Sequence, residues 1–562
     1  MTQLVSSPEF EYLGVYIPIS EYMNYYRGKW PRKVVDQTIT GILARTSRAG
    51  VLRGLGSLRN EIESDVKCEA ALNDLCSTLD SNHSLILKEI LKSDYPKRVL
   101  YTPQVIVQAS NYVLSVETVD NDSSNEYVDR ISALMLCHLM AEMNSLEGED
   151  GRQIRFGSKE FDAAALSFLA NHFFHANDDR LSELSRTRKL WKSKSVRACE
   201  SLNGMTPEQI FEMTVGVPID VRIAAALLLI GSISPGSGAT ASMKTRHEKW
   251  GAHLSSFIEK ISWQIDNSVD KIEAPSSEWD MSTFVERPCI SLSASELVIP
   301  GSALLVDRVT VGLLDEVETE MKTQNLPFNL LSAWGHVIED YVRERLSPLL
   351  VSRGVREIVE DEFANVYKDY LKKRPDLILD FGEDVLVIDV MKSGLSASTI
   401  YSQDVSKFRR ELDGRLFKKL GQLNNVISVI DAKPELLFPD GRQRRFIPII
   451  VSSDRWGHNP FIATYIEERC KKMGLFRSNN SVSPICLDIG EVELCEALIE
   501  QDLELDDLLR SWIDSDLYRM PFKNFFLKNF PTSRYRLRSS SLEEEFSQSI
   551  NEILREFGWI GE

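Results

Sequence analysis

Apolar residues in the first half of the chain recur at the spacing of amphipathic helices. The clearest stretches are Ile131–Met143, Phe161–Phe174 and Ile210–Ile233. Apolar positions three or four residues apart share one helix face, which is then buried. Thr206, Pro207 and Gln209 add a helix-start signature: an N-cap threonine, a proline at the first helical position and a glutamine in capping-box spacing. The pattern predicts a helical region over residues 1–280.

The pattern changes over residues 281–325, which we interpret as a linker with a β-like stretch at Cys289–Val306 and a charged helix at Val309–Thr323. From residue 326 onward the expected order is helix, strand, strand, helix, strand, which is typical of an α/β domain. We therefore expect a helical N-terminal region, used for recognition, homo-oligomer contacts or partner binding. An α/β domain at residues 326–562 follows it, with a central mixed sheet flanked by helices.

Two short apolar runs in this second half are predicted to be neighbouring strands. The first, Arg374–Leu379, carries Asp376 at its start, and the second is Val385–Val390. The second run is apolar on both faces except for Asp389, as in a strand that is buried on both sides. A buried charge is costly unless it is paired or bound to a metal. Asp389 is therefore a candidate functional residue.

An amphipathic helix is predicted at Leu330–Leu350, ahead of both strands. Trp334 and Ile338 belong to its apolar stripe, and Glu339 lies at the edge of that stripe. A glutamate at this edge can point along the sheet instead of into bulk water. From the pattern alone, Glu339 is either a solvated surface residue or part of a site.

Two carboxylates on adjacent strands, with a lysine beyond the second, suit metal-dependent hydrolysis of phosphodiesters. Carboxylates hold hard cations such as Mg²⁺, and such a cation lowers the pKa of bound water and offsets charge on the phosphate. A lysine can orient the water and stabilise the transition state. We therefore expect Asp376 and Asp389 to ligate Mg²⁺, with Mn²⁺ as a substitute, and Lys392 to position the nucleophilic water.

The stretch Leu330–Val451 resembles the PD-(D/E)XK nuclease superfamily, which has the restriction-endonuclease-like fold. The resemblance rests on Trp334-Gly335 and Glu339 in the leading helix, Pro375-Asp376, Asp389 with Lys392, and Gln422 in a following helix. It implies an active site made of Glu339, Asp376, Asp389, Lys392 and Gln422. It also implies that Glu339 and the backbone carbonyl of Val390 join the two aspartates as metal ligands, and that the substrate is DNA.

The chain departs from the superfamily pattern at one point. The superfamily places the acid and the lysine two residues apart, whereas Asp389 and Lys392 are three apart. In a regular strand these two side chains point to opposite faces. Either a β-bulge near Met391 re-aims the lysine, or the site is degenerate.

Two functional hypotheses follow from this alternative. The first is an endonuclease or exonuclease in a defence or mobile-element context. The second is a catalytically inactive nuclease fold that serves as a nucleic-acid-binding or scaffold subunit of a larger complex.

Net charge weakens the first hypothesis without excluding it. The chain of 562 residues carries a net charge of −18, whereas nucleic-acid-binding proteins usually show a basic surface. Three basic clusters, each either a solvated face or a phosphate-contacting surface, are Arg186–Arg197 with Trp191, Lys407–Lys419, and Lys523–Arg538 with several aromatic residues. If the chain binds nucleic acid, it must do so through a local patch.

Other features restrict the cellular setting and the chemistry. The eight cysteines show no CxxC spacing, so we expect buried free thiols in a reducing cytosol. The longest apolar run, Ile223–Ile233, is shorter than the ~20 residues of a membrane helix, and the N-terminus has no signal-peptide pattern. We therefore expect a cytoplasmic protein. His172 and His175 with the neighbouring Asp178 and Asp179 are interpreted as ordinary surface residues.

Overall fold

The computed structural model describes the last two thirds of the chain almost continuously and the first third in separate segments. The described residues are 47–63, 103–115, positions scattered over 129–169, and 180–558 apart from gaps at 233–240, 243–250, 266–271, 273–280, 294–295, 368–373, 393–394, 403, 454–457, 479 and 531–533. The histidine pair at His172 and His175 lies outside the described residues.

The chain divides into two compact units that interleave along the sequence. Unit 1 consists of Met1–Arg180, Asp220–Leu313 and Ala397–Asp404, and unit 2 of Leu181–Ile219, Leu314–Ser396 and Val405–Glu562. Residues 181–219 therefore pack with the expected α/β domain, although the sequence pattern groups them with the helical region. The expected division at 1–280, 281–325 and 326–562 stays a prediction about domains.

Unit 1 combines helices with a small mixed sheet. Its described elements include α4 (Arg48–Glu63), α7 (Pro103–Ser115), α13 (Ile219–Ser232), α14 (Gly251–Lys260), α16 (Ser302–Val309), and strands β1 (Ala241–Ser242), β2 (Ser262–Gln264), β3 (Cys289–Ser293) and β4 (Glu296–Val298). The strand order is β1-β4-β3-β2, with β2 and β3 parallel. The expected β-stretch Cys289–Val306 is correct only as far as β4, because Pro300-Gly301 ends it and α16 begins.

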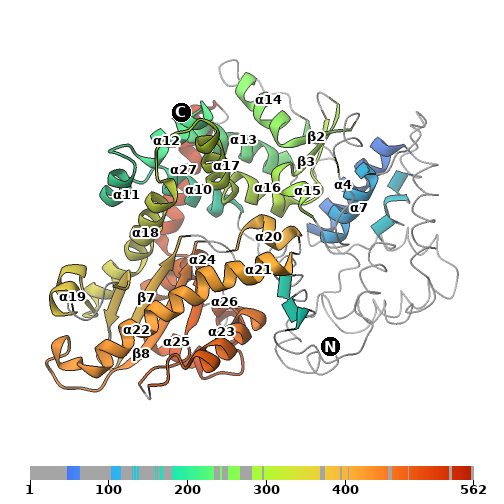
Figure 1. The fold of residues 1–562 in the computed structure, drawn as a ribbon. Coiled ribbons are helices and arrows are strands. Elements are labelled where there is room, and N and C mark those ends of the chain that lie inside the picture. The colour runs from blue at the N-terminus through green and yellow to red at the C-terminus, as the bar shows by residue number, and fades with distance from the viewer. Residues whose placement is uncertain are drawn as a thin grey trace, which may run out of the picture. The chain divides into compact units, whose positions relative to one another are not determined.

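Unit 2 is built around a five-stranded mixed sheet, shown in Figure 1. The strands are β5 (Arg356–Glu357), β6 (Leu377–Asp380), β7 (Asp384–Met391), β8 (Arg445–Ser452) and β9 (Ile485–Asp488), in the order β5-β6-β7-β8-β9. β5, β6 and β7 are antiparallel, whereas β7, β8 and β9 are parallel. All residues of β7 are buried, so it is the central strand that the apolar run predicts.

Helices cover the sheet of unit 2. Those that bear on the site are α10 (Arg180–Trp191), α11 (Val196–Ser201), α12 (Pro207–Val215), α18 (Leu330–Ser352), α19 (Glu360–Tyr367), α21 (Val405–Glu411), α22 (Lys418–Ala432), α23 (Pro460–Met473), α24 (Ile489–Glu500), α25 (Leu505–Ile513) and α27 (Ser540–Glu556). The long helix α22 runs along β7 and β8 (Figure 1), and α18 packs on α24.

Several local predictions are confirmed. α12 begins as expected, with reciprocal capping-box bonds between Thr206 and Gln209. The described chain is mostly helical with two mixed sheets. Each of the six cysteines within the described residues is free, and all but Cys199 are buried. No single described helix is long and apolar enough to span a membrane, although α12 and α13 counted together pass that test.

Candidate active site

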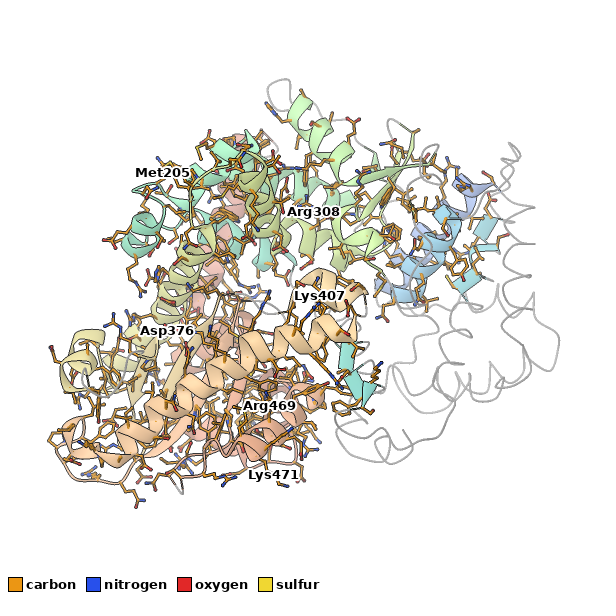
Figure 2. All side chains as sticks on the ribbon, viewed as in Figure 1. Met205, Arg308, Asp376, Lys407, Arg469 and Lys471 are labelled. Atoms are coloured by element: carbon orange, nitrogen blue, oxygen red, sulfur yellow. The ribbon has the colours of Figure 1, made fainter. Side chains whose placement is uncertain are left out.

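The candidate site lies where β6 begins and β7 ends. Asp376 immediately precedes β6, and Asp389 lies within β7. Leu377 pairs with Ile388 across the two strands, and the backbone N–H of Asp376 donates to the Ile388 carbonyl at 3.0 Å. The two aspartates are thus neighbours, with their carboxyl groups within hydrogen-bonding reach. Asp376 is labelled in Figure 2. The predicted adjacency of the two carboxylates is confirmed.

Asp389 is the more buried member of this pair. Its side chain is 6% exposed, whereas that of Asp376 is 20% exposed. Burial, together with repulsion from Asp376, raises the pKa of Asp389 well above its ordinary value. Asp376 is oriented by the neighbouring strand, because its Oδ2 accepts a hydrogen bond from the backbone N–H of Val390 at 2.6 Å.

Lys419 of α22 supplies the positive charge at this pair. Its Nζ forms an ion pair with Asp389 and lies 4.0 Å from Oδ2 of Asp376. Burial opposes the charge, but attraction from Asp389 and Asp376 outweighs burial, so the pKa of Lys419 is raised. The sequence pattern assigned this place to Lys392, and Lys419 was only the last residue of a basic cluster.

A π-helical segment, η2 (Leu412–Phe417), lies directly before α22 and continues α21. A π-turn holds more residues than an α-turn, so it changes the rotational position of every later residue. Lys419 is the second residue after this segment. The direction in which Lys419 points therefore depends on the π-helical segment as well as on the packing of α22.

The β-bulge considered near Met391 is not found on the β8 side of the strand. The register of β7 against β8 runs without a shift from Asp384 opposite Arg445 to Met391 opposite Ser452. Lys392 follows Met391, the last residue of β7, and the alternation of a regular strand would direct it away from the face of Asp389. Of the two alternatives, a bulge that turns Lys392 toward the aspartates finds no support in this ladder.

Lys392 instead passes over Gly335 of α18. A Cβ added at Gly335 would lie 2.5 Å from Cε of Lys392 and 2.6 Å from Cδ, which is closer than carbon atoms pack. The absence of a side chain at Gly335 leaves room for the lysine. Glu339 follows one turn later on the same helix. Within the described chain, Lys392 forms no ion pair with the aspartates.

Glu339 is held beside the aspartates by an arginine and a histidine. Its Oε2 lies 3.1 Å from the guanidinium of Arg197 and 3.0 Å from Nδ1 of His336, and its side chain is 10% exposed. Arg197 also pairs with Asp340, the next residue of α18. The charge of Glu339 contributes to the raised pKa of Lys419. Glu339 is thus part of the same electrostatic cluster as the two aspartates.

Gln422 and Val390 complete the expected set. Gln422 is half-buried on α22, about one helical turn beyond Lys419. In a strand, residues two apart direct their backbone groups to the same side. Because the carbonyl of Ile388 accepts from Asp376, the carbonyl of Val390 also faces the β6 side, beyond the first residue of that strand.

A cavity of about 230 Å³ opens beside Asp376. Its polar lining consists of Arg197, His336, Glu339, Arg343, Arg374 and Asp376, and its apolar lining of Ile358, Phe363, Pro375, Leu377 and Ile378. Arg343 donates to the backbone carbonyl of Asp376 at 3.0 Å and lies 3.1 Å from Glu357. The cavity therefore joins basic groups to one of the two carboxylates.

The two aspartates have the right chemistry to bind a divalent cation, but within the part of the chain that the structure describes no third carboxylate side chain lies beside them in position to share it. Carboxylate oxygens are the ligands that Mg²⁺ prefers, and the ammonium of Lys419 already lies where a positive charge is attracted by both aspartates. Among the described residues, no group of three or more His, Cys, Asp or Glu side chains is arranged to hold a metal ion. Asp376 and Asp389 are thus the core of the candidate cation site, and Glu339 remains bound to Arg197 and His336.

Two of the basic clusters are largely structural. In the first, Arg186 forms a bidentate pair with Glu493, at 2.5 and 2.6 Å. Trp191 is fully buried against Trp334 and Phe211, so it is not available for base stacking. The aromatic residues of the third cluster also pack on one another, as Phe525, Phe526, Phe530 and Tyr535 show. Arg197 is the residue of the first cluster that reaches the site.

The comparisons with known proteins leave the family open. No protein-family model, no curated protein and no solved structure matches this chain. The resemblance to the PD-(D/E)XK superfamily therefore rests on the residues themselves.

Three basic residues of the site were not among the expected site residues. Lys419, Arg197 and His336 contact the expected carboxylates. His336 lies three residues before Glu339 on a predicted helix, so helical spacing alone could have indicated this contact. Lys419 and Arg197 come from elements whose tertiary positions are not encoded in local periodicity.

Proposed function

We propose that unit 2 is a metal-dependent nuclease domain with the restriction-endonuclease-like fold, which hydrolyses phosphodiester bonds in DNA. The observation that carries this proposal is the pair Asp376 and Asp389 on adjacent strands, with the buried Asp389 facing the ammonium of Lys419. Burial of a carboxylate in the central strand of a sheet costs free energy of desolvation. That cost is offset when the carboxylate binds a cation, which supports a cation-binding function for Asp389.

The order of elements around the pair supports the proposed fold. α18 precedes two antiparallel strands, β6 and β7, and α22 leads from β7 to the parallel strand β8. The helix–strand–strand–helix–strand order is the one that the superfamily resemblance predicts. It brings together Asp376 before β6, Asp389 of β7 and Lys419 of α22.

In the proposed mechanism, Asp376 and Asp389 would hold Mg²⁺ or Mn²⁺, and the carbonyl of Val390, which faces the β6 side, would be a further ligand. When bound, this cation would supply activated water and charge neutralisation at the phosphate. Glu339, released from Arg197 and His336, would complete the acidic site.

Lys419 is the better placed of the two candidate lysines. Its ammonium already contacts Asp389, whereas Lys392 lies against Gly335 on α18. We propose that Lys419 would stabilise charge on the phosphate, while Asp376 and Asp389 would hold the cation. Lys392 would contribute from the α18 side, where it lies against Gly335, one turn before Glu339. Gln422, one turn after Lys419, would contact the phosphate or the attacking water.

A second candidate function is a nuclease fold without catalysis, acting as a nucleic-acid-binding or scaffold subunit. The ion pair of Lys419 with Asp389 favours it, because that pair neutralises the site without a metal. The net charge of −18 also favours it. The substrate DNA, a homo-oligomer or protein partner, the defence or mobile-element context and the cytoplasmic location rest on the sequence analysis and remain predictions.

Cleavage assays separate these functions. Linear DNA, supercoiled plasmid and single-stranded DNA are incubated with Mg²⁺ or Mn²⁺ and wild-type protein, Asp376→Asn, Asp389→Asn, Lys419→Met or Lys392→Met. We expect metal-dependent cleavage that falls by about 100-fold or more in both aspartate variants and in Lys419→Met. A wild-type protein that binds DNA but never cuts it would favour the scaffold function. Equal cutting by wild type and both aspartate variants would exclude this site as the active site.

A further inference from the structure

We propose that Arg343 of α18 is a positioning residue for the candidate cation site, and that it fixes the direction of the Asp376 carboxylate through the backbone. This inference rests on the proposed function, because Asp376 is one of the two carboxylates that would hold the cation. It adds to the site a pair of residues, Arg343 and Glu357, to which the sequence analysis gave no function.

Both peptide groups that flank the Cα atom of Asp376 are anchored. The N–H of Asp376 donates to the Ile388 carbonyl at 3.0 Å, and the carbonyl of Asp376 accepts from Nη2 of Arg343 at 3.0 Å. Because each peptide group is planar, these two hydrogen bonds together set the direction of the Cα–Cβ bond. The N–H of Val390 then orients the carboxylate itself by donating to Oδ2 at 2.6 Å.

The donor to the Asp376 carbonyl is a side chain because strand β5 ends too early to supply one. Ile358, directly after β5, donates to the Ile378 carbonyl at 3.0 Å, and the chain then leaves the sheet to form α19. Asp376 lies two residues before Ile378, beyond the reach of this ladder. Arg343 therefore takes the place that a longer β5 would occupy.

Arg343 is itself held from its other side. Its Nε lies 3.1 Å from Oε1 of Glu357 in β5, and Oε2 of Glu357 accepts from the buried hydroxyl of Ser347 in α18. A guanidinium is planar and its donors point in fixed directions. Contact of one edge with Glu357 therefore aims another edge at the Asp376 carbonyl, which a lysine could not reproduce.

A role in positioning makes a prediction about metal selectivity. Mg²⁺ demands near-ideal octahedral geometry, whereas Ca²⁺ accepts six to eight oxygen ligands in flexible arrangements. A small displacement of the Asp376 carboxylate should therefore weaken Mg²⁺ binding more than Ca²⁺ binding. Partial unfolding, in contrast, lowers both affinities by the same factor.

The test measures cation binding without DNA and without catalysis. Binding of Mn²⁺ is followed by electron paramagnetic resonance, and Mg²⁺ and Ca²⁺ affinities are obtained by competition against Mn²⁺. The proteins are wild type, Asp376→Asn, Arg343→Met, Glu357→Gln and a control, Arg356→Met. Chemical unfolding in EDTA establishes that each protein is folded under the conditions of the binding measurement.

Arg356 of β5 is a matched control for Arg343. Its side chain is 42% exposed, compared with 36% for Arg343. It also donates to a backbone carbonyl, that of Leu437 at 2.9 Å, and pairs with a glutamate, Glu362. Arg356→Met therefore removes the same kinds of contact without touching Asp376.

We expect Arg343→Met to weaken Mn²⁺ binding by about tenfold or more and to lower the ratio of Mg²⁺ affinity to Ca²⁺ affinity. Glu357→Gln should change both quantities less, in the same direction, and it decides the question if Arg343→Met does not fold. Arg356→Met should bind all three ions as wild type does. Wild-type affinities in both Arg343→Met and Glu357→Gln, equal losses for Mg²⁺ and Ca²⁺, or the same loss in Arg356→Met would overturn the proposal.

The Asp376→Asn variant keeps this proposal distinct from the proposed function. Wild-type protein that binds no Mn²⁺, or binds it equally well with Asp376→Asn, contradicts the cation site and with it the role of Arg343. Binding that depends on Asp376 but not on Arg343 contradicts the positioning role alone and leaves the proposed function standing.

Discussion

At the scale of single residues, the site is a balance of charges around Asp389. Burial and Asp376 raise the pKa of this carboxyl, and Lys419 lowers it. A cation binds only the ionised carboxylate, so its binding competes with protons. The same balance that favours a positive charge at the pair therefore also makes the site sensitive to pH.

Removal of Lys419 should shift the pH profile of cleavage. Because Lys419 lowers the pKa of Asp389, Lys419→Met raises that pKa further. Asp389 must be ionised to hold a cation, so activity falls on the acid side, and we expect this acid limb to move to higher pH in the variant. The measurement is kcat/KM against pH for both proteins. An acid limb at the same pH would show that Asp389 does not limit the reaction.

Gly335→Ala should separate stability from activity. Alanine in a helix interior is favoured over glycine by about 1 kcal/mol, but the new methyl group meets the side chain of Lys392. We expect an equal or higher melting temperature together with reduced cleavage. The control is Gly231→Ala in α13, where an added Cβ meets nothing within 4 Å.

The double variant Gly335→Ala/Lys392→Ala completes this test. If displacement of Lys392 causes the loss, Gly335→Ala has no further effect once Lys392 is absent. An additive loss would assign the effect to α18 itself.

At the scale of elements, local periodicity predicts most of what holds the site. The helix expected at Leu330–Leu350 is α18, and the run Val385–Val390 lies within β7. The sequence predicts these elements because one face or both faces are apolar over several residues. The position of Lys419 could not be predicted in this way: Lys419 reaches Asp389 from a helix that follows a π-helical segment, and such a segment leaves no periodic signal in the sequence.

The packing of β9 against α25 contains a histidine that should limit acid stability. His458 is fully buried, its ring contacts Trp512 and Tyr518, and its Nδ1 accepts from the backbone N–H of Cys486 at 3.3 Å. Burial lowers its pKa from 6.5 to about 3. The unfolded chain then binds a proton that the folded chain does not. The contribution of the neutral His458 to the free energy of unfolding is therefore complete above pH ~6.5, and it is lost as the pH falls toward the pKa of His458 in the folded protein.

Urea unfolding between pH 7 and 5 measures this loss. We expect the free energy of unfolding to fall by about 1 kcal/mol per pH unit below the ordinary histidine pKa because of this group, and less steeply in His458→Gln. The control His253→Gln, at an exposed position of α14, should leave the slope of wild type. The same slope in all three proteins would mean that other groups dominate.

At the scale of the whole chain, residues 181–219 complete unit 2 although they lie far from it in sequence. Arg186 pairs with the buried Glu493, and Trp191 packs on Trp334. The apolar pattern of these residues is helical like that of the rest of the N-terminal half, so sequence alone could not assign them to the sheet-containing unit. Arg197 brings the same segment into the candidate site.

Loss of Arg186 should therefore destabilise unit 2. Arg186→Met leaves Glu493, whose side chain is 7% exposed, without its guanidinium partner. Breaking a buried ion pair from one side costs about 3–5 kcal/mol, which chemical unfolding followed by intrinsic tryptophan fluorescence would detect. The control is Lys322→Ala, whose partner Glu318 lies one turn away on the surface of α17 (Gly312–Thr323). An exposed pair of this kind contributes about 0–1 kcal/mol, so similar losses in both variants would contradict the assignment.

The interleaving of the two units also has a consequence for synthesis on the ribosome. Lys189 of α10 pairs with Glu545 of α27 at 2.9 Å, and Arg188 pairs with Glu552 at 2.8 Å. Both contacts join positions more than 350 residues apart, so they form late and close a long loop. A nascent chain that has reached residue 530 has made every carboxylate of the site but lacks the helix that secures α10. The residues of the candidate site are therefore all synthesised before the contacts between α10 and α27 can form.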